Sequence, residues 1–110
     1  MFNKNKENWK HYVKQDEDIT IEVKETKEIC HIAASIPLNY SYFYSEQIME
    51  IMENTKEVVE SGDFICCSCE TLTIFRTCPR KKKYDKIEEL IAMLYSYKNM
   101  LPILLAMEEK

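Results

Sequence analysis

The spacing of apolar residues changes along the chain from every second residue to every third or fourth, and this change constrains the fold most. Residues 19–23 alternate apolar and polar side chains and predict a half-buried strand, and residues 28–35 predict a second, less regular strand. From Ser41 or Ser45 to Glu60 the spacing is helical, with Ser45 as a candidate N-cap. The first half of the chain is therefore expected to form two strands and a helix.

The second half of the chain repeats this order. Residues 64–69 and 72–77 are rich in β-branched and aromatic side chains and predict two further strands. Helical spacing resumes after Asp85, a candidate N-cap with Glu88 three residues later. Pro102 is expected to end this second helix or to restart it as a short apolar segment.

The predicted order ββαββα indicates an α+β fold. Two helices would cover one face of an antiparallel sheet of four to five strands, giving a two-layer sandwich. Because the two halves share one pattern of elements, a pseudo-repeat is also predicted. A length of 110 residues fits a single domain over residues 1–110. Within it, residues 1–17 are expected to form either an edge strand or a mobile segment.

Scarce glycine excludes several classes of nucleotide-binding site. The chain has one glycine, Gly62, where the first helix is expected to end. Gly-rich phosphate loops need several glycines, so P-loop, dinucleotide and kinase-type sites are excluded. The lysine-rich start of the chain lacks the apolar core of a signal peptide. The longest apolar run, residues 100–107, is too short to span a bilayer. We therefore expect a cytoplasmic protein that engages no membrane.

The cysteines and lysines bear on the compartment and the source. The five cysteines are odd in number and include the neighbours Cys66 and Cys67, so reduced thiols are expected, as in the cytosol. Lysine far outnumbers arginine, which is typical of an AT-rich genome such as that of a low-GC bacterium or a phage.

The net charge of −4 is distributed unevenly along the chain. One lysine and six acids give residues 29–63 a charge of −5, whereas six bases and two acids give residues 64–86 a charge of +4. Charge segregation of this kind bears on binding partners rather than on the fold. One acidic and one basic segment are therefore the candidate binding surfaces.

The acidic segment contains a stripe of glutamates on the first predicted helix, opposite its apolar face. Like charges four residues apart destabilise a helix by about a few tenths of a kcal/mol per pair, and only Lys56 lies near enough to offset them. We interpret the stripe as a surface for a basic partner, against the alternative of an ordinary solvated face. The chain would then be a non-enzymatic protein-binding or inhibitor module. The stripe comprises Glu46, Glu50, Glu53, Glu57 and Glu60.

The alternative function is binding of a nucleic acid or nucleotide through the basic segment 76–86. This segment is interpreted as a loop before the second helix, whose free N-terminal amides also favour anions. A solvated loop is the competing interpretation, and the acidic remainder of the chain argues against broad nucleic-acid binding. The candidate residues are Arg76, Arg80, Lys81, Lys82, Lys83 and Lys86.

A second alternative is a small thiol- or metal-dependent enzyme. Zinc takes four nitrogen or sulfur ligands, and the candidates are Cys66, Cys69, Cys78 and His31. The predicted hairpin places Cys78 opposite residue 63, too far from Cys69 to share a metal ion. We therefore predict no metal, no cofactor and no catalytic residue, and we interpret the cysteines as buried, inert thiols.

The C-terminal run 100–107 is apolar on every side of a short helix. Contact with the core uses only one of these sides, and leftover apolar area indicates an interface. We therefore expect the chain to form a homodimer through residues 100–107.

Overall fold

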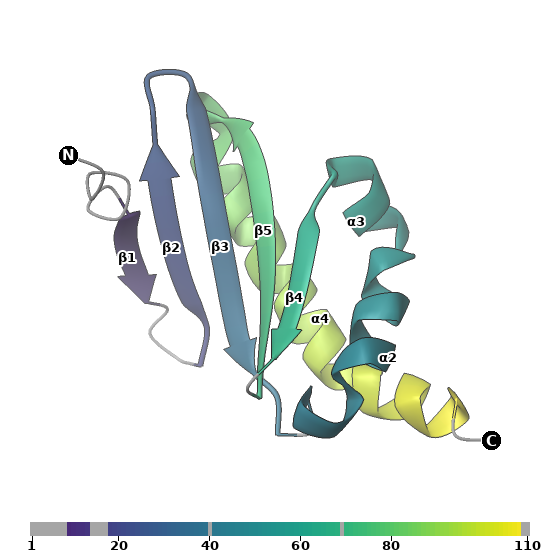
Figure 1. Ribbon diagram of the computed structural model, residues 1–110. Helices are drawn as coiled ribbons and strands as arrows, with labels where there is room; N and C mark the ends of the chain where they lie inside the picture. The colour runs from purple at the N-terminus through teal and green to yellow at the C-terminus, as the bar shows by residue number, and fades with distance from the viewer. Residues whose placement is uncertain (1–8, 14–17, 40, 69, 109–110) are drawn as a thin grey trace.

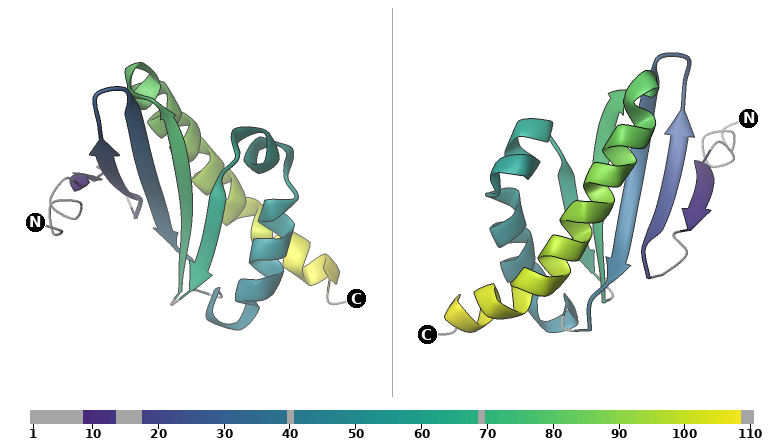
Figure 2. Two further views of the ribbon diagram at one scale, coloured as in Figure 1. Left: turned by 45° about the horizontal axis from the view of Figure 1, so that its top comes forward. Right: turned by 180° about the vertical axis from the view of Figure 1, so that it is seen from behind.

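The computed structural model describes residues 9–13, 18–39, 41–68 and 70–108. These residues form an antiparallel sheet with the strand order β1-β2-β3-β5-β4. Helices cover one face of the sheet (Figures 1 and 2), which confirms the predicted α+β two-layer sandwich. The strands are β1 (Trp9–Val13), β2 (Thr20–Glu25), β3 (Ile29–Pro37), β4 (Phe64–Ser68) and β5 (Thr71–Pro79).

The helical layer is built from two short helices and one long one. The long helix runs diagonally behind β3 and β5, and the short ones lie beside β4 (Figure 2). A single turn of 3₁₀-helix leads directly into the long helix. The helical elements are α2 (Ser41–Glu53), α3 (Lys56–Ser61), η1 (Arg80–Lys82) and α4 (Lys83–Glu108).

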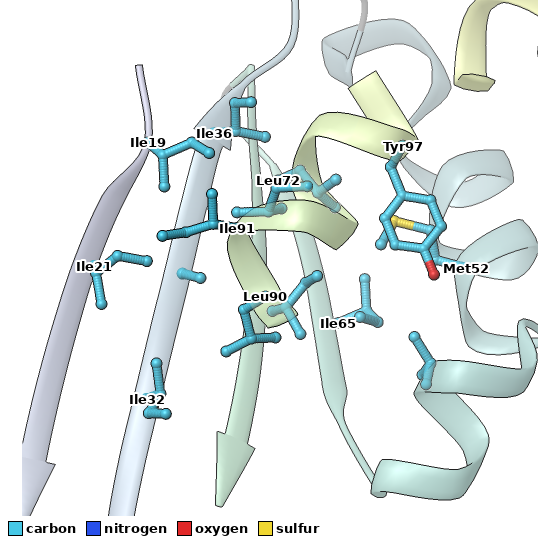
Figure 3. Close-up of a cluster of buried hydrophobic side chains, with 14 of the residues drawn as sticks. Ile19, Ile21, Ile32, Ile36, Met52, Ile65, Leu72, Leu90, Ile91 and Tyr97 are labelled. Carbon is cyan, nitrogen blue, oxygen red and sulfur yellow. The ribbon is translucent and has the colours of Figure 1, made fainter. Parts of the chain in front are cut away.

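The core lies between the sheet and α4, because the strands alternate buried and accessible residues while α4 buries one stripe. On β3 and β5 the side chains of Ile32, Ile36 and Leu72 are buried, and on α4 those of Leu90 and Leu94 meet them. Figure 3 shows Ile32, Ile36, Leu72 and Leu90 among the buried side chains between the two layers. The two periodicities that predicted the elements therefore also predict most of the core.

The predicted pseudo-repeat is visible in the strands but not in the helices. The hairpins β2-β3 and β4-β5 occupy opposite halves of the sheet, and their second strands, β3 and β5, pair at its centre. The helical segment that follows β3 is broken into α2 and α3, whereas α4 is continuous. The symmetry of the sheet is therefore not matched by its helical cover.

The first predicted helix is broken, and it begins at Ser41, one of its two predicted starts, with a kink just before the other, Ser45. Helix α2 begins at Ser41, bends at Tyr44 (φ −121°, ψ 22°) and ends at Glu53. Thr55 is extended (φ −74°, ψ 150°) and separates α2 from α3. Asn and Thr side chains compete with helical hydrogen bonds, which explains a break at this point.

The predicted helix end at Gly62 is confirmed. Gly62 adopts the left-handed conformation (φ 68°, ψ 33°) that closes many helices. Its N–H donates to the Val59 carbonyl at 3.3 Å, and the next N–H, of Asp63, donates to the Val58 carbonyl at 3.1 Å. The turn delivers Asp63 to the start of β4.

The second helix begins earlier and ends later than expected. Helix α4 starts at Lys83, so Asp85 lies inside its first turn and is not the N-cap. Pro102 neither ends nor restarts the helix, which continues past it. Leu101 and Leu105, on both sides of the proline, are buried. Their packing outweighs the hydrogen bond that proline removes.

Among the described residues, one helical stretch, 80–107, is long and apolar enough by length and composition to span a bilayer. It extends the apolar run that the sequence suggested, because the 3₁₀ turn and Pro102 do not interrupt it. In the fold, its Leu90, Leu94 and Leu101 are fully buried in the core.

Candidate functional site

The five glutamates of the predicted stripe all lie exposed on the outer side of α2 and α3, and we call them the acidic face. Because the helix is broken, they form two short arrays instead of one linear array, which corrects the sequence interpretation. No described residue forms an ion pair with any of them. The arrays are Glu46, Glu50 and Glu53 on α2, and Glu57 and Glu60 on α3.

The junction between the two arrays is held by side-chain hydrogen bonds. The Thr55 hydroxyl donates to the Met52 carbonyl at 2.9 Å and lies 2.9 Å from the Tyr97 hydroxyl on α4. The Asn54 amide donates to the Glu50 carbonyl at 2.8 Å. Burial raises the pKa of Tyr97, which therefore remains a neutral partner. The acidic face is thus fixed to the core helix and not carried on a free loop.

Several of these glutamates lie where the helix dipole disfavours them. Glu50 and Glu53 occupy the last turn of α2, and Glu60 occupies the last turn of α3. The C-terminal end of a helix carries partial negative charge, and neither last turn contains a base. These three glutamates therefore lower the stability of the helices that carry them, whereas Glu57 lies in the first turn of α3, where the dipole favours an acid.

Arg76 does not belong to a basic surface, which corrects the alternative hypothesis. It is 3 % exposed and lies on the helix-covered side of β5. Its guanidinium donates twice to Asp63, at 2.8 Å each, and once to Glu89, at 2.8 Å. Hydrogen bonds to Asp63 raise the pKa of Arg76 above its ordinary value, despite burial. The sequence hypothesis missed these ion pairs because Asp63, just before β4, and Glu89, on α4, are both 13 residues away from Arg76 in the sequence.

Three other members of the basic segment are also engaged in ion pairs. Arg80 lies 3.1 Å from Glu25, and Lys83 contacts the same carboxylate. Lys86 lies 3.2 Å from Glu89, on the same helix. The segment is not the predicted loop: it comprises the end of β5, the 3₁₀ turn and the start of α4. Only Lys81 and Lys82 in this segment remain exposed without an ion pair to a described residue. The segment is therefore a weak candidate for binding phosphate.

The structure does not bring together the three candidate metal ligands that it describes, Cys66, Cys78 and His31. Cys78 lies opposite Cys30 on the buried side of the sheet. It does not lie opposite residue 63 as expected, because β4 begins with Phe64 opposite Phe75 and Cys78 lies beyond that end. His31 lies on the other side, where its Nδ1 is 3.0 Å from the Thr77 hydroxyl. Cys66 lies on β4 opposite Thr73, and Cys69 lies outside the described residues. Among the described residues no group of three potential ligands occurs.

The buried thiols of Cys30 and Cys78 are expected to resist alkylation. Burial raises the pKa of Cys30 to about 11 and also raises the pKa of Cys78. At pH 8 only about one Cys30 thiol in a thousand is then ionised. Mass spectrometry after iodoacetamide treatment should find both unmodified in the native protein and modified in denaturant. Rapid modification of Cys30 before unfolding would contradict this placement.

The open side of the sheet carries an aromatic pair that the sequence hypothesis did not single out. Phe64 and Phe75 lie on β4 and β5 with ring centroids 5.9 Å apart, and both rings are accessible. They line a shallow hollow of about 360 Å³ together with Lys24 and His31. The sequence did contain a signal for this pair. Phe64 is followed by Ile65 and Phe75 is preceded by Ile74, so both faces of the predicted hairpin carry apolar side chains.

Comparisons with protein-family models, with curated proteins and with solved structures found no match. The function is therefore inferred from the surfaces described above.

Proposed function

We propose that the chain is a non-enzymatic protein-binding module whose acidic face engages a basic surface of a partner protein. The observation that supports this best is the exposure of all five glutamates, none of which forms an ion pair with a described residue. Lys56 is the only base between residues 41 and 61. A partner rich in arginine and lysine would supply the missing charges and would be steered to this face over long range.

The energetics of α2 and α3 also support a binding role. An acid in the last turn of a helix costs about 0.3–1 kcal/mol through the helix dipole, and Glu50, Glu53 and Glu60 are in such positions. A cationic partner would offset this cost, because it would neutralise both the carboxylates and the dipole end. The protein is therefore expected to gain stability when the partner binds.

The engaged cations make the alternative, nucleic-acid binding, less favourable. Arg76 is committed to Asp63, while Arg80 and Lys83 share Glu25. A phosphate would have to displace these carboxylates or rely on Lys81 and Lys82. The acidic face would in addition repel the nucleic-acid backbone.

Charge reversal on the acidic face should weaken binding of a fluorescent arginine-rich peptide by at least about tenfold at low salt. The variant replaces three glutamates of the face with lysine, and the matched control replaces three exposed glutamates elsewhere, so both change the net charge equally. Fluorescence anisotropy titrations measure the dissociation constants. The variant carries Glu50→Lys, Glu53→Lys and Glu60→Lys, and the control carries Glu28→Lys, Glu70→Lys and Glu88→Lys.

The control separates a binding face from a general effect of net charge. If the peptide recognises the acidic face, the control keeps most of the parent's affinity and the variant does not. Equal loss in both proteins would show that only the net charge matters, and unchanged binding in the variant would reduce the face to a solvated surface.

A further inference from the structure

The outward side of α4 carries an uncharged stripe that faces away from the sheet. All six of its members are exposed, and at 100° per residue they lie within about 100° of arc over about 23 Å of helix. Met100, Ile103 and Met107 are 46 %, 64 % and 65 % exposed. We call the six the α4 stripe: Ala92, Ser96, Asn99, Met100, Ile103 and Met107.

The stripe is not explained by the fold of one chain. The opposite side of α4 already supplies the core, through residues such as Leu94, Leu101 and Leu105. Lys98 is the only charged residue between 92 and 107, and it lies off the stripe, 3.2 Å from Asp18. Figure 2 shows the end of α4 extending past the sheet, so this end is open to a second helix. An exposed apolar stripe on a projecting helix indicates an interface.

The order of residue sizes along the stripe indicates which partner covers it. The members recur at intervals of three or four residues, as in helices that pair side by side. Small residues, Ala92 and Ser96, lie at one end, and large ones, Ile103 and Met107, lie at the other. We propose that the α4 stripe pairs with the α4 stripe of a second copy of this chain in antiparallel orientation, forming a two-fold symmetric dimer.

The antiparallel arrangement places large residues against small ones. With the two-fold axis between Asn99 and Met100, Ala92 faces Met107 of the second copy and Ser96 faces Ile103 of the second copy. Two-fold symmetry makes the same fit occur twice, as in isologous dimers. A parallel pair would place Met107 against Met107 and leave Ala92 against Ala92.

This inference rests on residues other than those of the proposed function, but the two surfaces adjoin, because Ala92 lines the same hollow as Glu57 and Glu60 of the acidic face. It refines the dimer expected from residues 100–107 by extending the contact to Ala92 and by setting its direction. One short helix pair is a small interface, so dissociation on the order of micromolar is expected.

Sedimentation velocity over a concentration series tests the dimer. The parent chain should pass from monomer to dimer as its concentration rises. Ser96→Lys should raise the dimer dissociation constant at least about 100-fold, because it places an unpaired charge in the contact. Gln47→Lys adds the same charge at an exposed position on α2 and should leave association unchanged. A parent that stays monomeric, or a Ser96→Lys variant that still dimerises, would overturn the proposal.

Site-directed cross-linking tests the direction of pairing. In an antiparallel dimer Met100 lies near the two-fold axis, so Met100→Cys should form a covalent dimer with a short bismaleimide, whereas Met107→Cys should not. The parent, with its own cysteines, is the control for background. Efficient cross-linking of Met107→Cys would overturn the antiparallel arrangement.

Flotation with phosphatidylglycerol vesicles distinguishes a second copy from a lipid surface. The dimer predicts that the chain stays out of the lipid fraction. Vesicle binding by a monomeric parent, abolished by Ser96→Lys, would overturn the proposal and assign the stripe to a membrane.

Discussion

Replacing Asp63 with asparagine is expected to lower the free energy of unfolding by about 3–5 kcal/mol, because it leaves the buried charge of Arg76 without its main partner. The Asp63 side chain is 0 % exposed and that of Arg76 is 2 % exposed, and two hydrogen bonds of 2.8 Å join them. Chemical denaturation monitored by circular dichroism measures the effect.

Two further variants separate the buried pair from its exposed neighbour. Glu89→Gln should cost less than about 1 kcal/mol, because the Glu89 side chain is half exposed and solvent screens it. The double replacement Asp63→Leu with Arg76→Met removes both charges and should recover most of the lost stability. A loss below about 1 kcal/mol for Asp63→Asn would contradict the geometry of this ion pair.

Pro102→Ala is expected to stabilise the protein by about 2 kcal/mol. A proline inside a helix costs about 3 kcal/mol relative to alanine, because it lacks the N–H that would bond to the Lys98 carbonyl. Removing proline also raises the conformational entropy of the unfolded chain, which reduces the gain in stability by up to about 1 kcal/mol. The gain requires α4 to be continuous through Pro102, as the structure has it.

Pro79→Ala is the matched control for this substitution. Pro79 precedes η1 with φ −62°, which is the angle that proline imposes, so alanine there should bring no gain. The two variants are compared by their midpoints of denaturation in urea. If α4 instead ended at Pro102, both substitutions would have equally small effects, and the long helix would be wrong.

The strands and most of the core were predictable because they depend on local spacing. Ile21, Ile32, Leu72 and Leu94 are buried as their periodicity predicts. The positions at which the helices break or continue were less predictable. Asn54 and Thr55 gave a weak signal that the helical spacing outweighed. Pro102 strongly predicted a helix end, but the buried contacts of Leu101 and Leu105 keep the helix continuous.

Pairing between distant strands could not be predicted from local spacing. The sequence hypothesis placed Cys78 by extending the β4-β5 hairpin, but the pairing with β4 ends at Phe75, and Cys78 pairs only on its other side, with Cys30 on β3. The same limit concealed the role of Arg76, whose partners Asp63 and Glu89 come from the start of β4 and from α4. Residue type and charge alone assigned Arg76 to the surface, whereas the fold places it inside.

The exposed glutamates were predictable as a set, because the spacing that buries Ile48 and Met52 turns the acids outward. Whether they bind a partner depends on chemistry outside this chain. The structure adds that their helices are fixed to α4 through Thr55 and Tyr97. It also adds that none of the glutamates forms an ion pair with a described residue.

Urea denaturation of the parent and of the charge-reversed acidic face, each with and without the arginine-rich peptide, tests the proposed function most directly. A ligand that binds only the native state raises its stability. The peptide should therefore raise the midpoint of the parent and leave that of the variant unchanged. Without peptide, the variant should be the more stable protein, because lysine suits the helix C-termini. Equal stabilisation of both proteins by the peptide, or none of the parent, would contradict a binding role for the acidic face.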